Sequence, residues 1–121
     1  MMAQRAGLPW VLLVEDDAMI GALMAELLGE LGYDVYPVEV TEAGAIAAAA
    51  RHRPDLMIVD LQLADGDGVS AMARIGRSGL VPHIFMTGDL SRPAAPGTIL
   101  LRKPFRQSDL IRAIEQAFDD V

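Results

Sequence analysis

Trp10-Val11-Leu12-Leu13-Val14 is a continuous apolar stretch that is followed directly by Glu15-Asp16-Asp17. An uninterrupted apolar run of this length is typical of a strand buried on both faces, because a half-exposed strand alternates apolar and polar residues. Such strands occur in parallel sheets that helices cover on both sides. Residues 10–17 therefore predict a central strand of an α/β fold with three acids at its carboxyl end.

Short apolar runs and longer amphipathic stretches alternate along the rest of the chain. Further strands are predicted at residues 35–38, 56–59, 84–86 and 98–101. Helical spacing of apolar residues predicts helices at 20–31, from Thr41 to before Pro54, from Val69 to a stop at Gly79, and at 110–118. Strands separated by helices form parallel βαβ units. We therefore expect an α/β fold with a doubly wound, five-stranded parallel sheet and flanking helices.

The same spacing assigns individual side chains to the core. In the first predicted helix these are Ile20, Leu23 and Met24. In the third they are Val69, Met72, Ala73 and Ile75, and the segment before it, Asp65-Gly66-Asp67-Gly68, has the composition of a turn.

The fourth crossover departs from this regular pattern. Only ten residues, Gly88 to Gly97, separate Thr87 from Thr98, and they include Pro93 and Pro96. A crossover that contains a helix needs about 10–12 residues or more, and proline interrupts a helix. We expect a loop with at most one helical turn, so that the fourth helix is short or missing.

Composition limits the classes of protein to which the chain can belong. Its 121 residues, with 17 acids, 10 bases, a net charge of −7 and no cysteine, fit a single domain, 1–121, with a flexible tail at 1–8. The negative charge argues against binding nucleic acid or an anionic membrane surface. The lack of cysteine excludes disulfides and zinc–thiolate sites. Neither a membrane-spanning run nor an apolar signal core is present, and we expect a cytoplasmic protein.

The residues at the predicted strand ends carry the functional signal. Glu15, Asp16 and Asp60 follow two of the strands, Thr87 ends another, and Lys103 lies just after the last. Parallel strands bring these ends to one edge of the sheet, where ligands bind in doubly wound folds. Clustered carboxylates need a cation or protons, and oxygen ligands in a half-open site suit Mg²⁺.

Each of these residues also has an ordinary structural explanation. Asp17 suits a helix N-cap, an acid at a strand end is often a loop residue, and a lysine or threonine can simply be a surface or strand residue. In combination, however, the set suggests phosphoryl chemistry. Asp60 is then the candidate nucleophile, while Lys103 and Thr87 hold the remaining oxygens.

The motifs resemble those of the CheY-like response-regulator receiver domain of two-component signalling. They are Val-Leu-Leu-Val-Glu-Asp-Asp at 11–17, Asp60 at its strand end, Asp65-Gly66-Asp67-Gly68, Met86-Thr87-Gly88 and Lys103-Pro104-Phe105, and they occur in the family's order and spacing. The resemblance covers the chain from about Trp10 to Phe118. It implies a flavodoxin-like sheet with strand order 2-1-3-4-5.

The resemblance also assigns roles to the site residues. It implies that Asp60 is the phosphoacceptor and that Mg²⁺ is held by Asp60, by Asp16 directly, by Glu15 through water and by the backbone carbonyl of Gln62. It also implies that Thr87 and Lys103 bind phosphoryl oxygens and that Gln62 and Asp89 influence hydrolysis of the acyl phosphate. A cis peptide is expected between Lys103 and Pro104. A histidine kinase or histidine phosphotransfer protein is expected to dock at Ala18 and Met19.

One position departs from the family pattern. Leu100 stands where receivers usually carry Tyr or Phe, so the rotation of an aromatic ring that reports phosphorylation is unavailable. Leu100 and the shortened fourth crossover together suggest that the protein signals through ordering of that loop, or through a different surface from the usual one at the fourth helix and fifth strand. The sequence here resembles stand-alone receivers of alphaproteobacterial stress phosphorelays.

The resemblance implies a single-domain response regulator, a phosphoprotein that catalyses only its own phosphorylation and dephosphorylation. With no output domain, it acts on another protein as a relay, a phosphate sink or a switch, and as a monomer or weak dimer. The alternative is a pseudo-receiver that binds proteins independently of phosphorylation.

Other chemistries fit the residues less well. An aspartyl hydrolase needs a second acid two residues after the nucleophile, where Gln62 stands. A mononucleotide-binding loop would carry small residues in place of Glu15-Asp16-Asp17. A calcium-binding loop from Asp65 would need glutamate where Gly76 stands.

Overall fold

Five parallel strands form the centre of the protein in a computed structural model that describes residues 8–93 and 95–119. The strands are β1 (Trp10–Val14), β2 (Asp34–Val35), β3 (Leu56–Asp60), β6 (His83–Thr87) and β7 (Leu100–Arg102). Their spatial order is β2-β1-β3-β6-β7, and every neighbouring pair is parallel. This confirms the predicted α/β fold with the flavodoxin-like strand order 2-1-3-4-5.

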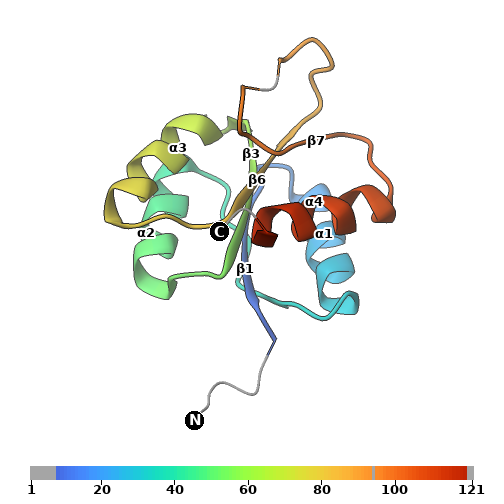
Figure 1. Cartoon of the computed structure of the whole chain (residues 1–121). Helices are drawn as coiled ribbons and strands as arrows, with labels where there is room; N and C mark the ends of the chain where they lie inside the picture. Colours follow the sequence, from blue (N-terminus) through green and yellow to red (C-terminus); the bar gives the residue numbers. More distant parts are fainter. Residues whose placement is uncertain (1–7, 94, 120–121) are drawn as a thin grey trace.

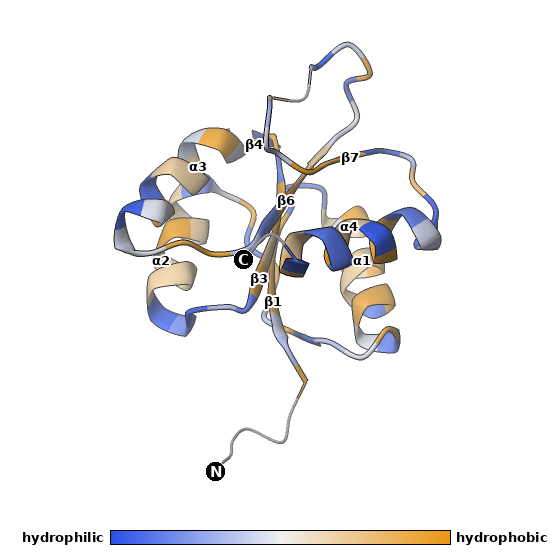
Figure 2. Ribbon diagram, in the orientation of Figure 1, coloured by the Kyte–Doolittle hydropathy of each residue, from blue (hydrophilic) through white to orange (hydrophobic). Residues whose placement is uncertain are grey.

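Helices cover both faces of the sheet (Figure 1). On one face, α1 (Ala18–Glu30) and α4 (Gln107–Asp119) cover a core that includes Val11 and Leu13 of β1. On the other, α2 (Glu42–His52) and α3 (Gly68–Ile75) pack against Leu12 and Val14, and the short 3₁₀ helix η1 (Gly76–Ser78) extends α3. Successive residues of a strand point to opposite faces, which is why one unbroken apolar run supplies both cores (Figure 2).

Two strands are shorter than their predicted ranges, whereas β3 and β6 are slightly longer. The second, predicted at 35–38, pairs as a strand only at Asp34–Val35. The Tyr36 N–H still donates to the Val11 carbonyl oxygen at 3.1 Å, but Glu39 rather than Val38 then donates to Leu13, so the regular register ends and Glu39 forms an isolated bridge with Val14. The last strand begins at Leu100 rather than Thr98, because Thr98 instead bonds back to Ala95 in the preceding turn.

Two predicted helix faces were partly wrong. Leu23 is 60% exposed, whereas Met24 and Leu28 face the core. In α3, Val69 is 48% exposed and Ala73 is also exposed, while Ala71 takes an inward position. The apolar residues of α1 and α3 occupy more than one helical face, so their spacing alone leaves the rotation of each helix undetermined.

The segment after β3 also differs from the simple turn that was predicted. Gln62–Leu63 (β4) and Gly66–Asp67 (β5) form a small antiparallel hairpin, whose turn is at Ala64 and Asp65. Asp67 then caps α3, because its Oδ1 accepts a hydrogen bond of 3.0 Å from the Ser70 N–H. The chain thus enters α3 directly from the hairpin.

In the described part of the fourth crossover, residues 88–93 and 95–97, there is no helix, as predicted. The guanidinium of Arg102 on β7 donates to the carbonyl oxygens of Asp89 and Leu90, both at 3.4 Å, and of Arg92 at 2.8 Å. This side chain therefore holds the first half of the loop against the end of the sheet.

The chain ends can be described only in part. Of the tail predicted at 1–8, residues 1–7 lie outside the described residues, and Leu8 is 45% exposed. The longest described helices, α1 and α4, have 13 residues each, and none of the helices in the described ranges has the length and apolar character needed to cross a membrane.

Gly68 allows α3 to begin directly beside Asp60. A Cβ at this position would lie against the carbonyl oxygen of Asp60 and 2.9 Å from Cγ1 of Val59, both in a closely packed region. We expect Gly68→Ala to lower the free energy of unfolding by about 1–3 kcal/mol, the usual cost of overpacking, as measured by denaturant titration.

Gly76→Ala is the matched control for this substitution. Gly76 lies at the other end of α3 with ordinary helical dihedral angles, and no atom lies within 4 Å of its added Cβ. It is expected to be neutral or stabilising by up to about 1 kcal/mol, because alanine restricts the unfolded chain. Equal losses for the two variants would contradict the close approach at Gly68.

Candidate functional site

Three acids from two neighbouring strands meet at the carboxyl edge of the sheet. Glu15 and Asp16 directly follow β1 and Asp60 ends β3, and the register that pairs Val14 with Val59 brings these strand ends together. One oxygen of each carboxylate lies within 4.8 Å of the others. Glu15 and Asp60 are buried, with 1% and 6% of their surfaces exposed, whereas Asp16 is exposed. The acids that were predicted to cluster do so.

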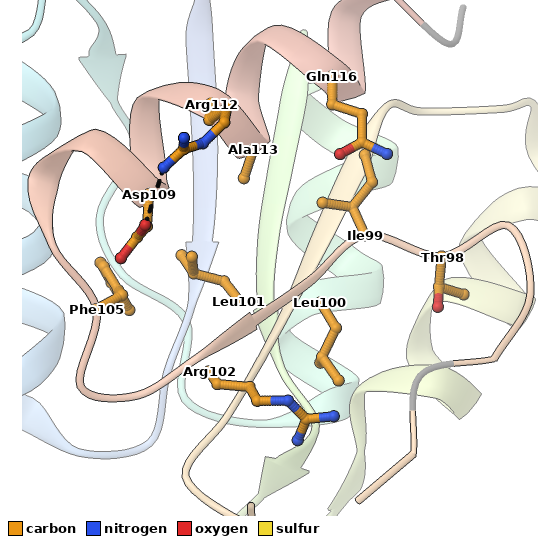
Figure 3. Close-up of a pocket in the computed structure, with 10 residues that line it drawn as sticks. All are labelled: Thr98, Ile99, Leu100, Leu101, Arg102, Phe105, Asp109, Arg112, Ala113 and Gln116. Atoms are coloured by element: carbon orange, nitrogen blue, oxygen red, sulfur yellow. Dashed lines mark hydrogen bonds and ion pairs between the residues drawn. The ribbon is translucent and has the colours of Figure 1, made fainter.

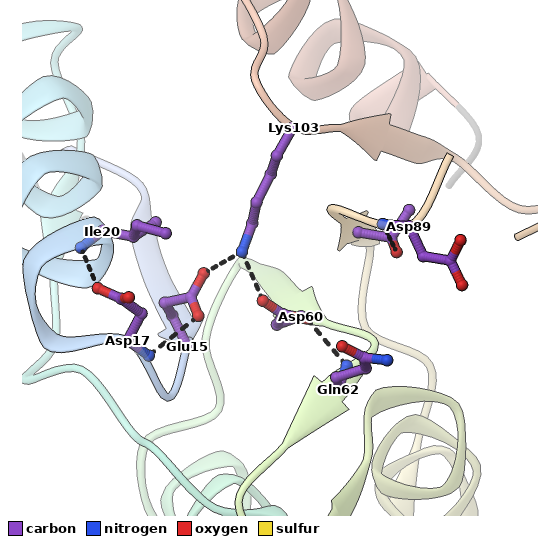
Figure 4. Close-up of polar contacts among 8 residues, drawn as sticks. Glu15, Asp17, Ile20, Asp60, Gln62, Asp89 and Lys103 are labelled. Atoms are coloured by element: carbon purple, nitrogen blue, oxygen red, sulfur yellow. Dashed lines mark hydrogen bonds and ion pairs between the residues drawn. The ribbon is translucent and has the colours of Figure 1, made fainter. Parts of the chain in front are cut away.

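Lys103 joins the two buried acids. Its Nζ lies 2.5 Å from Oε1 of Glu15 and 2.6 Å from Oδ2 of Asp60 (Figure 4). The backbone N–H of Lys103 donates to the carbonyl oxygen of Thr87 at 2.8 Å, and the peptide to Pro104 is cis, as expected from the resemblance. The lysine side chain is 18% exposed, so this is largely a buried ion-pair network.

Burial and charge change the proton affinities at this site. Burial raises the pKa of the Glu15 carboxyl, and the nearby charge of Asp60 acts in the same direction, against the hydrogen bonds from Lys103 and the Asp17 N–H. Burial by itself would lower the pKa of Lys103, but the hydrogen bonds and charges of Asp60 and Glu15 outweigh it and raise that pKa. The lysine is therefore held as a cation.

The donor set suits a hard divalent cation. Three carboxylates face a single ammonium group, which leaves an excess of negative charge once all are ionised. The ligand atoms are all oxygens, and Asp16 is exposed on the open side of the cluster. The acidic cluster could therefore bind a metal ion through Glu15, Asp16 and Asp60.

Thr87 ends β6, the strand beside Asp60, and its side chain is buried. Its Oγ1 accepts a hydrogen bond of 3.0 Å from the backbone N–H of Asp89. Because this bond uses a lone pair of the hydroxyl, the hydroxyl hydrogen can still be donated to another oxygen. Thr87 is thus suited to donate to an anionic group beside Asp60.

Gln62 and Asp89 stand in different relations to Asp60. The N–H of Gln62 donates to Oδ1 of Asp60 at 2.9 Å, so Gln62 is a direct neighbour of this carboxylate. The Asp89 carboxylate instead accepts from the N–H and hydroxyl of Ser91 and points away from Asp60 (Figure 4). These bonds from the Ser91 hydroxyl and N–H lower the pKa of Asp89.

Ala18 and Met19, the predicted docking residues, lie exposed at the start of α1, close to the acidic cluster. Met19 is 73% exposed, and Leu23, one helical turn farther on, is 60% exposed. Leu23 was missed as a surface residue. Its spacing of four residues from Met19 is the signal that could have found it.

Leu100, at the position where the family's aromatic residue usually stands, is half-buried on β7 and packs toward the α2 and α3 face of the sheet. Leu101 points to the opposite side, toward α4 (Figure 3). A groove of about 510 Å³ lies along β7 and α4, with the exposed ion pair of Arg112 and Asp109 at its rim. The edge strand is therefore accessible along this groove.

Sequence reasoning also missed Glu42 and the role of Asp65. These two residues lie 23 positions apart, and they connect α2 to the β4–β5 hairpin beside Asp60. A carboxylate that caps a helix from a distant turn leaves no local sequence pattern, so no signal in the chain indicates this contact.

Comparisons with known proteins agree with this geometry. A family model for the response regulator receiver domain matches residues 11–115. The transcriptional regulatory protein PdtaR of Mycobacterium tuberculosis is 39% identical over 117 residues, which cover 88% of this chain and 55% of PdtaR. The phyllosphere-induced regulator PhyR of Methylorubrum extorquens is 32% identical, with 88% of this chain and 42% of PhyR covered. The chain thus spans about half the length of these relatives.

Solved structures show the same similarity. The REC domain of the Erythrobacter litoralis PhyR response regulator has a TM-score of 0.81 and 32% identity, with 93% of this chain and 92% of that chain covered. The anti-anti-sigma factor PhyR from Bartonella quintana has a TM-score of 0.80 and 28% identity, with 96% of this chain and 49% of that chain covered.

Proposed function

The chain belongs to the response regulator receiver domain family, and from this we propose that it accepts a phosphoryl group on Asp60 from a histidine kinase or a histidine phosphotransfer protein. The observation that carries the proposal is the contact of Asp60 with Lys103 inside a buried acidic cluster, with Thr87 on the adjoining strand. A carboxylate oxygen of Asp60 forms the new P–O bond. The P–N bond to the partner's histidine breaks, and the imidazole keeps the electron pair.

Glu15, Asp16, Asp60 and the backbone carbonyl of Gln62 are the residues that would hold Mg²⁺. When bound, the ion neutralises the carboxylates and phosphoryl oxygens that would otherwise repel each other. The excess of carboxylates over ammonium groups in the cluster supports this assignment.

The remaining groups act on the phosphoryl oxygens. The Lys103 ammonium already lies 2.6 Å from Asp60, so a phosphoryl group on Asp60 is within reach of this cation. The Thr87 hydroxyl, which accepts from the Asp89 N–H, donates its hydrogen to a second phosphoryl oxygen. Gln62 and Asp89 flank the site and influence how fast water hydrolyses the acyl phosphate.

Signalling is proposed to occur through protein partners. Ala18 and Met19, extended by Leu23, form an exposed apolar surface on α1, which begins directly after Glu15 and Asp16, and a kinase or phosphotransfer helix bundle would dock there. PhyR from Bartonella quintana is an anti-anti-sigma factor, and an output through another protein is proposed for this chain too. The phosphorylated chain would serve as a relay, a phosphate sink or a switch in the cytoplasm.

The proposed Mg²⁺ site can be tested by substituting each of two adjacent acids, Asp16 and Asp17. Asp16→Asn removes a carboxylate from the cluster and is expected to raise the dissociation constant for Mg²⁺ at least roughly tenfold in calorimetric titrations, and to slow phosphorylation by acetyl phosphate. A chelator should prevent labelling of the wild-type chain.

Asp17→Asn is the control for this measurement. Asp17 caps α1 through a bond of 2.9 Å from the Ile20 N–H, and asparagine caps helices as well as aspartate does. The control should therefore bind Mg²⁺ as the wild-type chain does. Indistinguishable affinities for Asp16→Asn and Asp17→Asn would refute the metal assignment.

A further inference from the structure

The first turn of α2 is capped by a residue from the β4–β5 hairpin. Oδ1 of Asp65 accepts from the Glu42 N–H at 2.5 Å, and Oδ2 accepts from the Ala43 N–H at 3.3 Å. The local cap, Thr41, accepts from the next N–H, that of Gly44, at 2.9 Å. Three consecutive N–H groups of this helix start are therefore bonded, two of them to a carboxylate that comes from the segment after Asp60.

Glu42 makes the return contact. Its Oε1 accepts from the backbone N–H of Asp67 at 3.1 Å, and its Oε2 accepts from the Ser70 hydroxyl at 2.8 Å. Gly66 lets the carboxylate come this close, because a Cβ at that position would meet Oε1 of Glu42. We call these four bonds the clasp: Asp65 accepts from the N–H groups of Glu42 and Ala43, and Glu42 accepts from the Asp67 N–H and the Ser70 hydroxyl.

The clasp is connected to Asp60 through the residues and backbone hydrogen bonds of the β4–β5 hairpin. Asp67, bonded to Glu42, pairs with Gln62 across the hairpin. The N–H of Gln62 in turn donates to Oδ1 of Asp60 at 2.9 Å. The next backbone bond, from the Gly68 N–H to the Leu61 carbonyl oxygen at 2.9 Å, closes the hairpin where α3 begins.

A hairpin with two residues in each strand is too small to be stable alone in water. Its position must come from contacts with the rest of the molecule, and the clasp supplies three hydrogen bonds to the hairpin itself, while its fourth bond joins Glu42 to Ser70 at the start of α3. We propose that Glu42 and Asp65 are positioning residues, which hold the β4–β5 hairpin so that Gln62 stays beside Asp60 in the arrangement that metal binding requires. This inference rests on the proposed function.

The experiment compares two aspartates of the same hairpin. Asp65→Ala removes the hairpin's side of the clasp. Asp67→Ala removes a helix cap of similar kind, the bond to the Ser70 N–H, but leaves the backbone bond from Asp67 to Glu42 in place. Both variants lose a helix cap, so a purely structural role of Asp65 would give similar results for the two.

Two readouts separate positioning from stability. In metal-free protein, amide exchange followed by NMR should become faster at Gln62 and Asp67 in Asp65→Ala, whereas in Asp67→Ala the Gln62 amide should exchange as in the wild-type chain. In calorimetric titrations, Mg²⁺ should bind roughly tenfold more weakly to Asp65→Ala than to Asp67→Ala. Saturating Mg²⁺ should restore the rate of phosphorylation in Asp65→Ala.

Glu42→Ala should reproduce both effects from the other side of the clasp, and Asp65→Asn, which keeps an acceptor oxygen for the α2 N–H groups, should partly restore Mg²⁺ affinity. Equal Mg²⁺ affinities for Asp65→Ala and the wild-type chain would overturn this inference alone. A wild-type chain that binds no Mg²⁺ at all would overturn the proposed function with it.

Discussion

Lys103→Met is expected to lower the free energy of unfolding by about 3–5 kcal/mol at neutral pH in the absence of divalent cations. The substitution keeps a long side chain but removes the cation that lies 2.5 Å from Glu15 and 2.6 Å from Asp60. Both acids are buried, so each would have to remain charged without a partner or take up a proton. Denaturant unfolding of the wild-type and variant chains measures the difference.

Arg112→Met is the matched control. Arg112 pairs with Asp109 at 3.1 Å, but the two side chains are 72% and 41% exposed. Exposed ion pairs contribute only about 0–1 kcal/mol, so this variant should unfold almost as the wild-type chain does. Equal effects of Lys103→Met and Arg112→Met would show that the buried network contributes no more than a surface pair.

Two further measurements identify why Lys103→Met loses stability. In an Asp60→Asn background, Lys103→Met should cost less, because one of the two stranded charges is already absent. Mg²⁺ should stabilise Lys103→Met more than the wild-type chain, since the folded variant offers three carboxylates with no competing ammonium. If Mg²⁺ stabilises both chains equally, the ion does not compete with the Lys103 ammonium for the same carboxylates.

The arrangement of the site could be predicted because strand ends are strongly determined by sequence. The apolar runs that end at Val14 and Val59 locate the ends of β1 and β3 to within one residue, and the parallel βαβ rule brings those ends to one edge. Glu15, Asp16 and Asp60 follow directly, and Lys103 reaches them from the next strand but one. Predicting that these residues meet required only the positions of the strand ends and the parallel order of the strands.

Helix orientation was harder to predict, for a physical reason. An error of one residue in phase rotates a helix by about 100°, and α1 is apolar on several sides. Leu23 was therefore assigned to the core although it is exposed, and Val69 and Ala73 of α3 were misplaced in the same way. Met24 was assigned correctly, because it is buried in the core together with Leu28, but the spacing alone did not separate these buried positions from Leu23.

Hydrogen bonds from individual side chains to the backbone of distant segments could not be predicted, in contrast to the meeting of the strand ends. The loop nature of the fourth crossover followed from its length and prolines, but the bonds from Arg102 to the Asp89 and Arg92 carbonyls did not. The hydrogen bonds between Asp65 and Glu42 also join segments that are far apart in the sequence. Such bonds depend on the relative placement of whole elements, which the sequence pattern does not specify.

Asp60→Asn is expected to abolish phosphorylation while leaving the fold intact, because Lys103 keeps its bond to Glu15 and the buried site loses one of two like charges. Asparagine lacks the carboxylate that forms an acyl phosphate. Asp17→Asn, which keeps the α1 cap, is the control and should be labelled as the wild-type chain is.

The most direct measurement is mass spectrometry of the wild-type chain, Asp60→Asn and Asp17→Asn after incubation with acetyl phosphate and Mg²⁺, with peptide mapping of the label. The wild-type chain and the control should gain the mass of one phosphoryl group on the peptide that contains Asp60, and Asp60→Asn should gain none. An unlabelled wild-type chain, or equal labelling of Asp60→Asn, would contradict the phosphoacceptor role and favour a receiver that only binds proteins.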